Sequence, residues 1–267
     1  MLIINADDWG RSVAETDAAL KCFRERRITS VSAMVFMQDS KRAARLAKDY
    51  ELDDVGLHLN FSEEFTDKSC SETLKEHQGR IIRFLKRGKY AQLLYNPFLR
   101  KAFASSYRAQ VEEFMRLFEK SPSHIDGHHH MHLCANLLLS KLIPIGMKLR
   151  RNFSFWPGEK SMLNRTYRWL VDRWLARRYC LADYFFDLTQ CIEEKKLDRV
   201  AALAKSSDVE LMTHPIVNKE EAYLMSDGFG VMLERRRQVA LVQLDFPEIG
   251  VRADQSLDPE NLVGRRC

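Results

Sequence analysis

The sequence predicts an α/β fold, a distorted or incomplete (β/α) barrel of the TIM-barrel type, formed by a single domain over residues 1–267. Two observations support this prediction. Short apolar segments alternate along the chain with longer segments of helical period, a pattern typical of a mostly parallel sheet wrapped by helices. The length of 267 residues suits one such barrel, and no repeat or Pro/Ser-rich linker divides the chain.

Seven segments are expected to form strands, because each is a short apolar run flanked by polar or turn residues. In chain order they are residues 2–6, 31–37, 55–60, 123–126, 147–150, 184–187 and 209–214. This number approaches the strand count of a closed barrel. The competing architecture is an open doubly wound sheet, but the glycine-rich phosphate-binding turn expected after its first strand is missing.

Helices are expected between these strands, where apolar residues recur at helical spacing. In chain order they are residues 13–26, 40–49, 81–94, 105–120, 135–143, 160–178 and 193–206. Residues 61–79 are polar and show no clear period. We therefore expect them to form a long loop after the third strand, of the kind that contributes a lid or a substrate wall.

Composition and charge exclude several classes of protein. Apolar residues make up 45% and charged residues 30% of the chain, which is ordinary for a folded globular domain and excludes disorder. No run approaches the ~18 consecutive apolar residues of a membrane span. The first residues lack a basic leader, so we expect a cytoplasmic protein. A net charge of +5 is too small to indicate a nucleic-acid partner, and we expect none.

Two adjacent carboxylates, Asp7 and Asp8, follow the first predicted strand. The carboxyl ends of the strands are where a barrel places its functional residues. Adjacent carboxylates repel each other, so the pair suggests a cation or a basic side chain nearby. The alternative interpretation is a solvated turn or a helix N-cap, where aspartate is common.

The third predicted strand carries polar residues on one face only. Because side chains alternate along a strand, His58 and Asn60 share one face while the leucines beside them point to the other. This arrangement favours an apolar face toward the helices and a polar face toward the barrel mouth. A single strand histidine is also commonly a hydrogen-bonded core residue, which is the alternative.

Histidines crowd into one short segment after the fourth predicted strand. Four of the eight histidines, His128, His129, His130 and His132, lie within five positions and follow Asp126. Neutral imidazole is a common ligand of zinc and related ions, and a nearby carboxylate often fixes its tautomer. Spacing does not choose the ligand, because a helical segment pairs different histidines from an extended one. An accidental polar tract is the alternative.

The last predicted strand also ends in a histidine, His214. Pro215 disfavours an α conformation at His214, so an extended chain end presents the imidazole. A buried structural histidine is the alternative. Four polar sites, each at the carboxyl end of a strand, are less readily explained by coincidence than any one of them.

Taken together, these segments resemble the ordered motifs of the YdjC-like carbohydrate deacetylases, which include chitooligosaccharide deacetylases and hopanoid-associated sugar deacetylases. The motifs are NADDWG at 5–10, GLHLN at 56–60 and HIDGHHHMH at 124–132, and THP at 213–215 extends the similarity. The resemblance implies a distorted barrel that holds one divalent metal ion. It also implies a metal-dependent hydrolase that removes the N-acetyl group of an amino sugar or glycan.

Carried over residue by residue, the resemblance gives each polar group a role. Asp8, His58 and His128 would bind the metal. Asp7 would be the general base and His214 the general acid. The cation would lower the pKa of water and polarise the amide carbonyl, and the acid would protonate the leaving amine.

Further residues are expected near this site. Arg150 resembles a family arginine, and we expect it to pair with Asp7 and keep it ionised. One position departs from the family pattern: relatives commonly have glycine after the His-Pro pair, where this chain has Ile216. That departure affects the expected shape of the last substrate loop. Residues predicted to support the metal or contact substrate are Asn60, Asp126, His130 and His132.

Aromatic residues beside the motifs are candidates for sugar stacking. These are Trp9, Phe61 and Trp156, with burial in the core as the alternative for each. Residues 148–178 carry nine Lys or Arg against two acidic residues. The helix expected at 160–178 is amphipathic and basic, which suits an anionic membrane or a lipid-linked glycan, or simply a solvated barrel helix.

The sequence leaves the metal and parts of the function open. One carboxylate and two imidazoles suit magnesium or zinc, with manganese or cobalt as alternatives. The same residues would also suit another metal-dependent hydrolase, such as a phosphoesterase, or a noncatalytic glycan-binding relative. Relatives suggest a homodimer.

Overall fold

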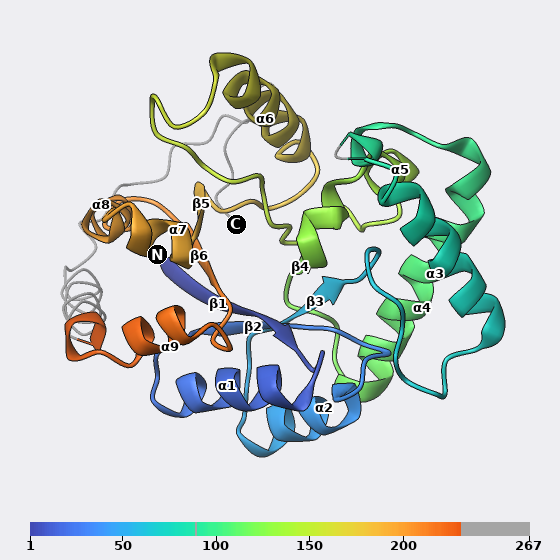
Figure 1. Cartoon of the computed structure of the whole chain (residues 1–267), viewed down its shortest axis with the longest axis horizontal. Helices are drawn as coiled ribbons and strands as arrows, with labels where there is room; N and C mark the ends of the chain where they lie inside the picture. Colours follow the sequence, from blue (N-terminus) through green and yellow to red (C-terminus); the bar gives the residue numbers. More distant parts are fainter. Residues whose placement is uncertain (89, 231–267) are drawn as a thin grey trace, which may run out of the picture.

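A computed structural model describes residues 1–88 and 90–230, and at its centre is a sheet of six parallel strands. The strands are β1 (Leu2–Trp9), β2 (Ser30–Ala33), β3 (Val55–Leu59), β4 (Ile125–Gly127), β5 (Tyr184–Asp187) and β6 (Val209–Thr213). Their order is β4-β3-β2-β1-β6-β5, and helices surround the curled sheet (Figure 1). This confirms the α/β class and the distorted barrel. Of the domain predicted over 1–267, residues 89 and 231–267 lie outside the described part.

The strand predicted at 147–150 is corrected to two isolated bridges. One bridge joins Leu149 to Ile125 of β4, and the other joins Lys148 to Cys180 on the β5 side. With one rung on each side, the paired stretch is too short for a ladder. The segment therefore spans the gap between the edge strands β4 and β5 without becoming a seventh strand.

Helices follow the strands in the predicted alternation. They are α1 (Val13–Arg24), α2 (Ser40–Asp49), α3 (Glu72–Leu85), α4 (Arg100–Phe118), α5 (Ala135–Ser140), α6 (Met162–Leu175), α7 (Leu188–Glu193), α8 (Leu197–Leu203) and α9 (Asn218–Leu224). Short 3₁₀ turns are η1 (Ala91–Leu93), η2 (Pro97–Leu99) and η3 (His128–Leu133). In the described part of the chain, no helix is long and apolar enough to cross a membrane.

Several predicted segments are wrong in their boundaries: for example, β2 ends at Ala33 and not at residue 37, and α4 begins at Arg100 and not at residue 105. The helix expected at 81–94 is α3, which begins nine residues earlier at Glu72 and shortens the loop expected at 61–79. It begins there because the Ser71 hydroxyl caps it by accepting from the Leu74 amide at 3.3 Å. Sequence periodicity missed this start, because the first turns of α3 are polar.

The helix expected at 193–206 is the shorter α8, and α7, which ends at Glu193, was not expected. Helix α7 begins at Leu188 because the Asp187 carboxylate accepts a hydrogen bond from the Gln190 amide at 2.7 Å. Lys195 adopts a left-handed backbone, with φ of +53°, which separates α7 from α8. Helix α9 was not expected, since it is short and begins with a polar run.

The core positions the strands rigidly. Every residue of β3 and β6 is buried, and Ile4, Ala6 and Trp9 of β1 are fully inaccessible. Because all six strands are parallel, their carboxyl ends meet at one rim of the curled sheet. Polar residues that end β1, β3, β4 and β6 are therefore brought together at this rim.

Candidate active site

The end of β1 presents two carboxylates to the same site. Side chains of successive strand residues normally point to opposite faces. Here Asp8 adopts a left-handed backbone, with φ of +65°, and the pairing with β2 shifts register between Ala6 and Trp9. Such a bulge re-aims side chains. As a result, Nε2 of His58 lies 3.9 Å from Asp7 Oδ2 and 3.3 Å from Asp8 Oδ1.

His58 on β3 is held by a carboxylate behind it. Its Nδ1 lies 2.8 Å from Asp126 Oδ1 on the neighbouring strand β4, where the two residues are register partners. Asp126 is inaccessible to solvent and its other oxygen accepts from Ser32 at 2.7 Å. A carboxylate on Nδ1 orients the ring and leaves Nε2 free to act as a ligand.

His128 begins the 3₁₀ turn η3 directly after β4. Its Nδ1 lies 2.8 Å from Asp8 Oδ1 and its Nε2 lies 3.2 Å from Glu63 Oε1. The next two residues, His129 and His130, have left-handed φ values of 52° and 58°, so the chain bends sharply here. The bend explains why neither helical nor strand spacing could identify the ligand.

Glu63 was not predicted, and it lies in the loop after β3. Asn60 folds this loop, because its side-chain oxygen accepts from the amides of Ser62 (3.1 Å) and Glu63 (2.9 Å). Arg11 then fixes the Glu63 carboxylate with two hydrogen bonds of 3.0 and 2.8 Å. Only the polar character of the 61–79 segment hinted at a functional residue in this loop.

Asp8, His58 and His128 form a buried group that fits a metal ion. One ligand atom from each lies within 4.8 Å of the others. Among the described residues, Asp8 Oδ1 and His128 Nε2 are buried and make no hydrogen bond of good geometry, although Asp8 Oδ1 lies 2.8 Å from His128 Nδ1 and His128 Nε2 lies 3.2 Å from Glu63 Oε1. Buried polar atoms normally have partners. One carboxylate and two imidazoles are also a common donor set for divalent cations.

Three further groups of metal-ligand type occur in the described chain, and one of them is already neutralised. The group of Asp7, His58 and Asp126 has its carboxylates bonded to Arg150. In the group of Asp8, His58 and His128, the Asp8 carboxylate has a looser arginine contact among the described residues. Arg11 Nη1 lies 3.9 Å from Asp8 Oδ2. The group of Asp8, His58 and His128 is therefore the less neutralised of these two and suits a cation better.

The charges around Asp8, His58 and His128 also favour a cation at this group. Burial lowers the pKa of the His58 imidazole, but the surrounding carboxylates, Asp126 foremost, raise it to about 10. Burial likewise opposes ionisation of Asp8, yet its histidine neighbours hold its pKa well below the ordinary value. The site is therefore rich in negative charge, and a bound cation would replace the proton on His58, since a ligating imidazole is neutral.

Arg150 is the hub of a buried ionic network. Its Nη1 and Nη2 each donate to the Asp7 carboxylate at 2.7 Å, so the contact expected from the sequence is present. It also lies 2.7 Å from Asp126 and 2.6 Å from Glu210. Burial raises the pKa of Asp7, but the Arg150 guanidinium and the His58 imidazole together outweigh burial and hold that pKa below its ordinary value. Asp7 is thus an ionised, fixed carboxylate beside Asp8, His58 and His128.

His214 lies across the site from Arg150, at the end of β6. Its Nε2 is 4.0 Å from Asp8 Oδ2, and 30% of its side chain is accessible. The Glu220 carboxylate accepts from the His214 amide at 2.6 Å and so anchors the chain end. Asp187 at the end of β5 lies close enough to form a ligand-type group with these two residues. Neither acid was predicted.

His130 and His132 do not join the metal group. Burial foremost lowers the pKa of His130 to about 3 and that of His132 to about 4, so both are neutral. The His132 ring lies 3.0 Å from the Arg150 carbonyl oxygen, behind the site. The His130 ring packs edge-on against Phe153, with ring centroids 4.5 Å apart.

The predicted stacking aromatics lie apart from the metal group. Trp9 is inaccessible, and its indole donates to the Ala43 carbonyl oxygen at 3.1 Å. Phe61 is also inaccessible and packs against Phe103 in the core. Trp156 stacks on Phe186 of β5, with ring centroids 4.6 Å apart. Trp9 and Phe61 therefore offer no ring face to a sugar.

Comparison with known proteins places this site in a family. The family model described as "YdjC-like protein" matches residues 1–244. A chitooligosaccharide deacetylase of Proteus mirabilis is 26% identical over 233 residues, covering 80% of this chain and 81% of the relative. A carbohydrate deacetylase of Danio rerio is 32% identical over 137 residues, 49% of this chain and 42% of the relative.

Other relatives match over a shorter span or in fold alone. A chitooligosaccharide deacetylase of Yersinia pestis is 31% identical over 136 residues, and the chain spans about half (51%) of its length. A crystal structure from Enterococcus faecalis, titled a putative cellobiose-phosphate cleavage protein, superposes with a TM-score of 0.57 at 19% identity. The superposition covers 88% of this chain and 94% of the Enterococcus faecalis chain, and it shows that the two share a fold.

Proposed function

The chain belongs to the YdjC-like family, and we propose that it is a metal-dependent hydrolase that removes the N-acetyl group of an amino sugar or of a glycan containing N-acetylglucosamine. One observation carries the proposal. Asp8, His58 and His128 converge at the rim of the sheet, with an arginine-held carboxylate, Asp7, beside them and an accessible histidine, His214, beyond. The names of the curated relatives supply the class of substrate.

A divalent cation held by Asp8, His58 and His128 would lower the pKa of water and polarise the amide carbonyl. Magnesium or zinc is proposed, with manganese and cobalt as alternatives. Asp126 and Glu63 keep the two imidazoles oriented from behind, at 2.8 and 3.2 Å. Such outer carboxylates fix the tautomer of a ligating histidine.

Asp7 is proposed as the general base. Its carboxylate is ionised because Arg150 lowers its pKa, and Asn5 donates a further hydrogen bond to it at 2.8 Å. It accepts a proton from the attacking water while Arg150 keeps it in place. Arg150 thereby acts as a positioning residue, since it contacts the base and not the substrate.

His214 is proposed as the general acid. Its partly accessible imidazole is held at the far side of Asp8 by the Glu220 contact to its amide. When the C–N bond of the amide breaks, the imidazolium donates its proton to the nitrogen, because an amine anion is a poor leaving group. The products are acetate and a free amino sugar.

The experiment is a substrate panel with metal-replete protein. Free, oligomeric, nucleotide-linked and lipid-linked N-acetyl sugars are incubated separately, and acetate and free amine are measured together. We expect release of both in equal amounts from at least one sugar. Phosphate release from sugar phosphates without any acetate would contradict the proposal and favour a phosphoesterase. Glycan binding without turnover would indicate a noncatalytic relative.

The single domain, the homodimer and the cytoplasmic location remain predictions from the sequence. Analytical ultracentrifugation of the full chain tests the homodimer directly.

A further inference from the structure

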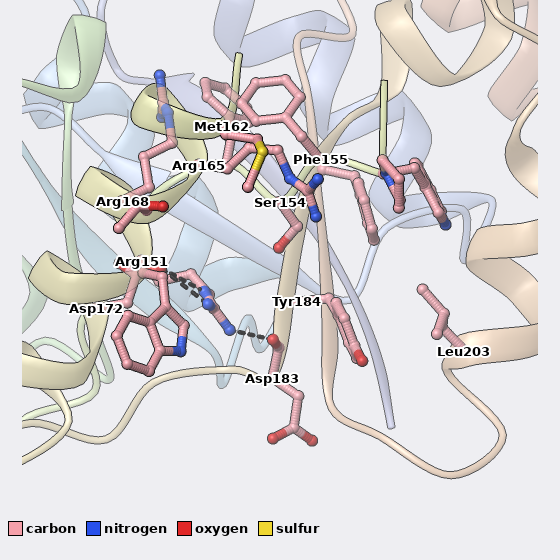
Figure 2. A pocket seen from close by; sticks show the side chains of 16 residues that line it. Arg151, Ser154, Phe155, Met162, Arg165, Arg168, Asp172, Asp183, Tyr184 and Leu203 are labelled. Atoms are coloured by element: carbon pink, nitrogen blue, oxygen red, sulfur yellow. Dashed lines mark hydrogen bonds and ion pairs between the residues drawn. The ribbon is translucent and has the colours of Figure 1, made fainter. Parts of the chain in front are cut away.

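A cavity of about 580 Å³ lies outside the barrel, between α6, the segment 151–157 and the outer face of β5 (Figure 2). Aromatic rings form much of its wall. They are Phe153, Phe155, Trp156, Trp169, Tyr184 and Phe186. In a regular barrel, a helix packs on this face of the strand. Here α6 stands away from β5 and leaves apolar ring surface open.

Strand β5 explains why the cavity is separate from the active site. Its side chains alternate, so Phe185 and Asp187 point inward while Tyr184 and Phe186 point outward. Phe185 is inaccessible and lies under the Arg150 guanidinium, 4.9 Å from ring centroid to carbon. The outer pair lines the cavity, and Phe186 stacks on Trp156.

Two arginines of α6, Arg165 and Arg168, line this aromatic cavity without an acidic partner. In the described chain, neither guanidinium lies within ion-pair distance of a carboxylate. Arg168 donates its Nε to Asn164 at 2.8 Å and stacks over Phe155 at 5.2 Å. Burial lowers its pKa, and the nearby Asp172 carboxylate only partly offsets this effect.

Arg151 lines the same cavity but, unlike Arg165 and Arg168, has an acidic partner. Its guanidinium is paired with Asp172 at 2.8 Å, and it also donates to the carbonyl oxygen of Asp183. Figure 2 shows these contacts as dashed lines. Arg151 is therefore already neutralised, whereas Arg165 and Arg168 have donors available for an anion.

A second cavity of about 310 Å³ adjoins the aromatic cavity. It is lined by His129 and His130 at one end and shares Arg151, Phe153 and Arg168 with the aromatic cavity. The His129 ring lies beside the ring of the metal ligand His128, with centroids 4.0 Å apart. The second cavity therefore extends from Arg168 to the residue next to His128.

The surface of α6 around the cavity is apolar. Met162 and Leu163 are more than 80% exposed, at 81% and 84%, and Trp169 and Leu170 are each 54% exposed. Large apolar side chains are normally exposed singly and not as a group on one helix. A ligand with a hydrocarbon part would meet this surface as it enters.

From these features we propose that the aromatic cavity binds the apolar, phosphate-bearing part of a lipid-linked amino-sugar substrate, with Arg165 and Arg168 holding the phosphate. The aromatic rings and α6 accept the hydrocarbon. The second cavity, lined by His129 and His130, leads the sugar toward Asp8, His58 and His128. The identity of this ligand as a substrate rests on the proposed deacetylase function, whereas its binding does not. Nucleotides are disfavoured as ligands, because few side chains of the cavity wall could form hydrogen bonds with the edge of a base.

The first test measures binding to the metal-loaded full chain by calorimetry and tryptophan fluorescence. The probes are farnesyl phosphate, farnesol, inorganic phosphate and UMP, each below its aggregation concentration. We expect farnesyl phosphate to bind at least about tenfold more tightly than farnesol, since its phosphate adds charge-assisted hydrogen bonds. It should also bind at least about tenfold more tightly than inorganic phosphate, since its hydrocarbon buries apolar surface. Equal binding of farnesol, tighter binding of UMP or no binding of farnesyl phosphate would overturn the proposal.

Variants locate the site. The double variant Arg165→Gln/Arg168→Gln should weaken farnesyl phosphate at least about tenfold. Arg177→Gln/Arg178→Gln is the matched control, because it removes two positive charges just beyond the end of α6 and outside the cavity lining. Equal weakening in the control and the double variant would show a general charge effect and contradict the assignment. Circular dichroism checks that each variant is folded.

The second test links the cavity to turnover. Acetate release is compared for N-acetylglucosaminyl farnesyl diphosphate and for di-N-acetylchitobiose. In the double variant, the ratio of kcat/KM for the lipid-linked sugar to that for chitobiose should fall at least about tenfold. An unchanged ratio would overturn the role in substrate binding. If the unaltered protein releases acetate from neither sugar, the proposed function fails while the binding result stands independently.

Discussion

Two arginine-containing regions lie on opposite faces of β5, and they differ in how their charge is neutralised. Inside the barrel, Arg150 is inaccessible and contacts the carboxylates of Asp7, Asp126 and Glu210 at 2.6–2.7 Å. Outside it, the guanidinium of Arg168 has no carboxylate partner among the described residues. The first arginine is fully committed to protein groups, whereas the second is available to a ligand.

The difference teaches how to separate a positioning cation from a binding one. A guanidinium bonded to several carboxylates fixes their geometry and lowers their pKa values, as Arg150 does for Asp7. A half-buried guanidinium without a counterion is costly unless an anion completes it. The inner region should therefore respond to substitution with loss of catalysis or stability, and the outer region with loss of ligand affinity.

The largest expected effect tests the inner region through the base. Asp7→Asn removes the proton acceptor but keeps the shape and a hydrogen-bonding group beside Arg150. Turnover should fall by about 10²–10⁴-fold, the usual contribution of a general base. Metal binding should persist, since the residues proposed to hold the metal are Asp8, His58 and His128. Acetate assays and metal analysis on the same sample measure both.

The companion variant for this prediction is His58→Ala, which should lose metal and turnover together. A turnover near normal in Asp7→Asn would remove Asp7 from the role of base. Loss of metal in that variant would instead place Asp7 among the ligands.

The second prediction compares neighbouring arginines for stability. Arg150→Met leaves buried carboxylates without their counterion, which should cost about 3–5 kcal/mol in free energy of unfolding. Arg151→Met breaks a half-buried pair with Asp172 and should cost only about 1–2 kcal/mol. Urea denaturation of the metal-free proteins measures both. Equal losses would contradict the distinction between a committed hub and a peripheral pair.

The sequence predicted the inner region better than the outer one, for a physical reason. Asp7, His58, Asp126 and His214 stand at the ends of strands, and parallel strands bring their carboxyl ends to one rim whatever the details of the helices. Glu63 was missed, because it reaches the site from a loop and its position depends on the turn that Asn60 makes.

Irregular backbone explains the remaining errors. The choice among the histidines could not be made from spacing, since His129 and His130 break both helical and strand periods with left-handed φ angles. The outer cavity depends on the segment 151–157, which has no regular structure, and on how far α6 stands from β5. Periodicity carries no information about such distances.

The third prediction uses packing density to sharpen the comparison. Around Gly56 in β3 the interior has no room, because a Cβ there would overlap the His124 ring. That ring is held at 3.0 Å by Ser32, which also donates to Asp126. Gly56→Ala should destabilise the protein by about 1–3 kcal/mol through overpacking.

The matched control for this prediction is Gly79→Ala within α3. The nearest neighbour of its Cβ would be the Arg83 guanidinium at 3.6 Å, an ordinary contact. Removing a helical glycine should stabilise the protein by about 0.5–1 kcal/mol. Thermal melts that shift in the same direction for both variants would show that the inner region tolerates added volume.

The smallest expected effect concerns the pairing of charges at the opposite end of the barrel. Asp54 lies 3.4 Å from His124, and Ser123 donates to the same carboxylate at 2.5 Å. Burial opposes ionisation of Asp54, but the hydrogen bonds from His124 and Ser123 lower its pKa from 3.8 to about 2. The folded state therefore holds this carboxylate ionised where the unfolded chain would already bind a proton.

The stabilisation from Asp54 should accordingly be complete above about pH 5 and disappear as the pH falls from 3.8 through about 2. Because the side chain is 45% exposed, solvent screening limits the effect to less than about 1 kcal/mol. The difference in unfolding free energy between the unaltered protein and Asp54→Asn, followed against pH, measures it. A difference that persists unchanged at pH 2 would mean that the charge of Asp54 does not stabilise the fold.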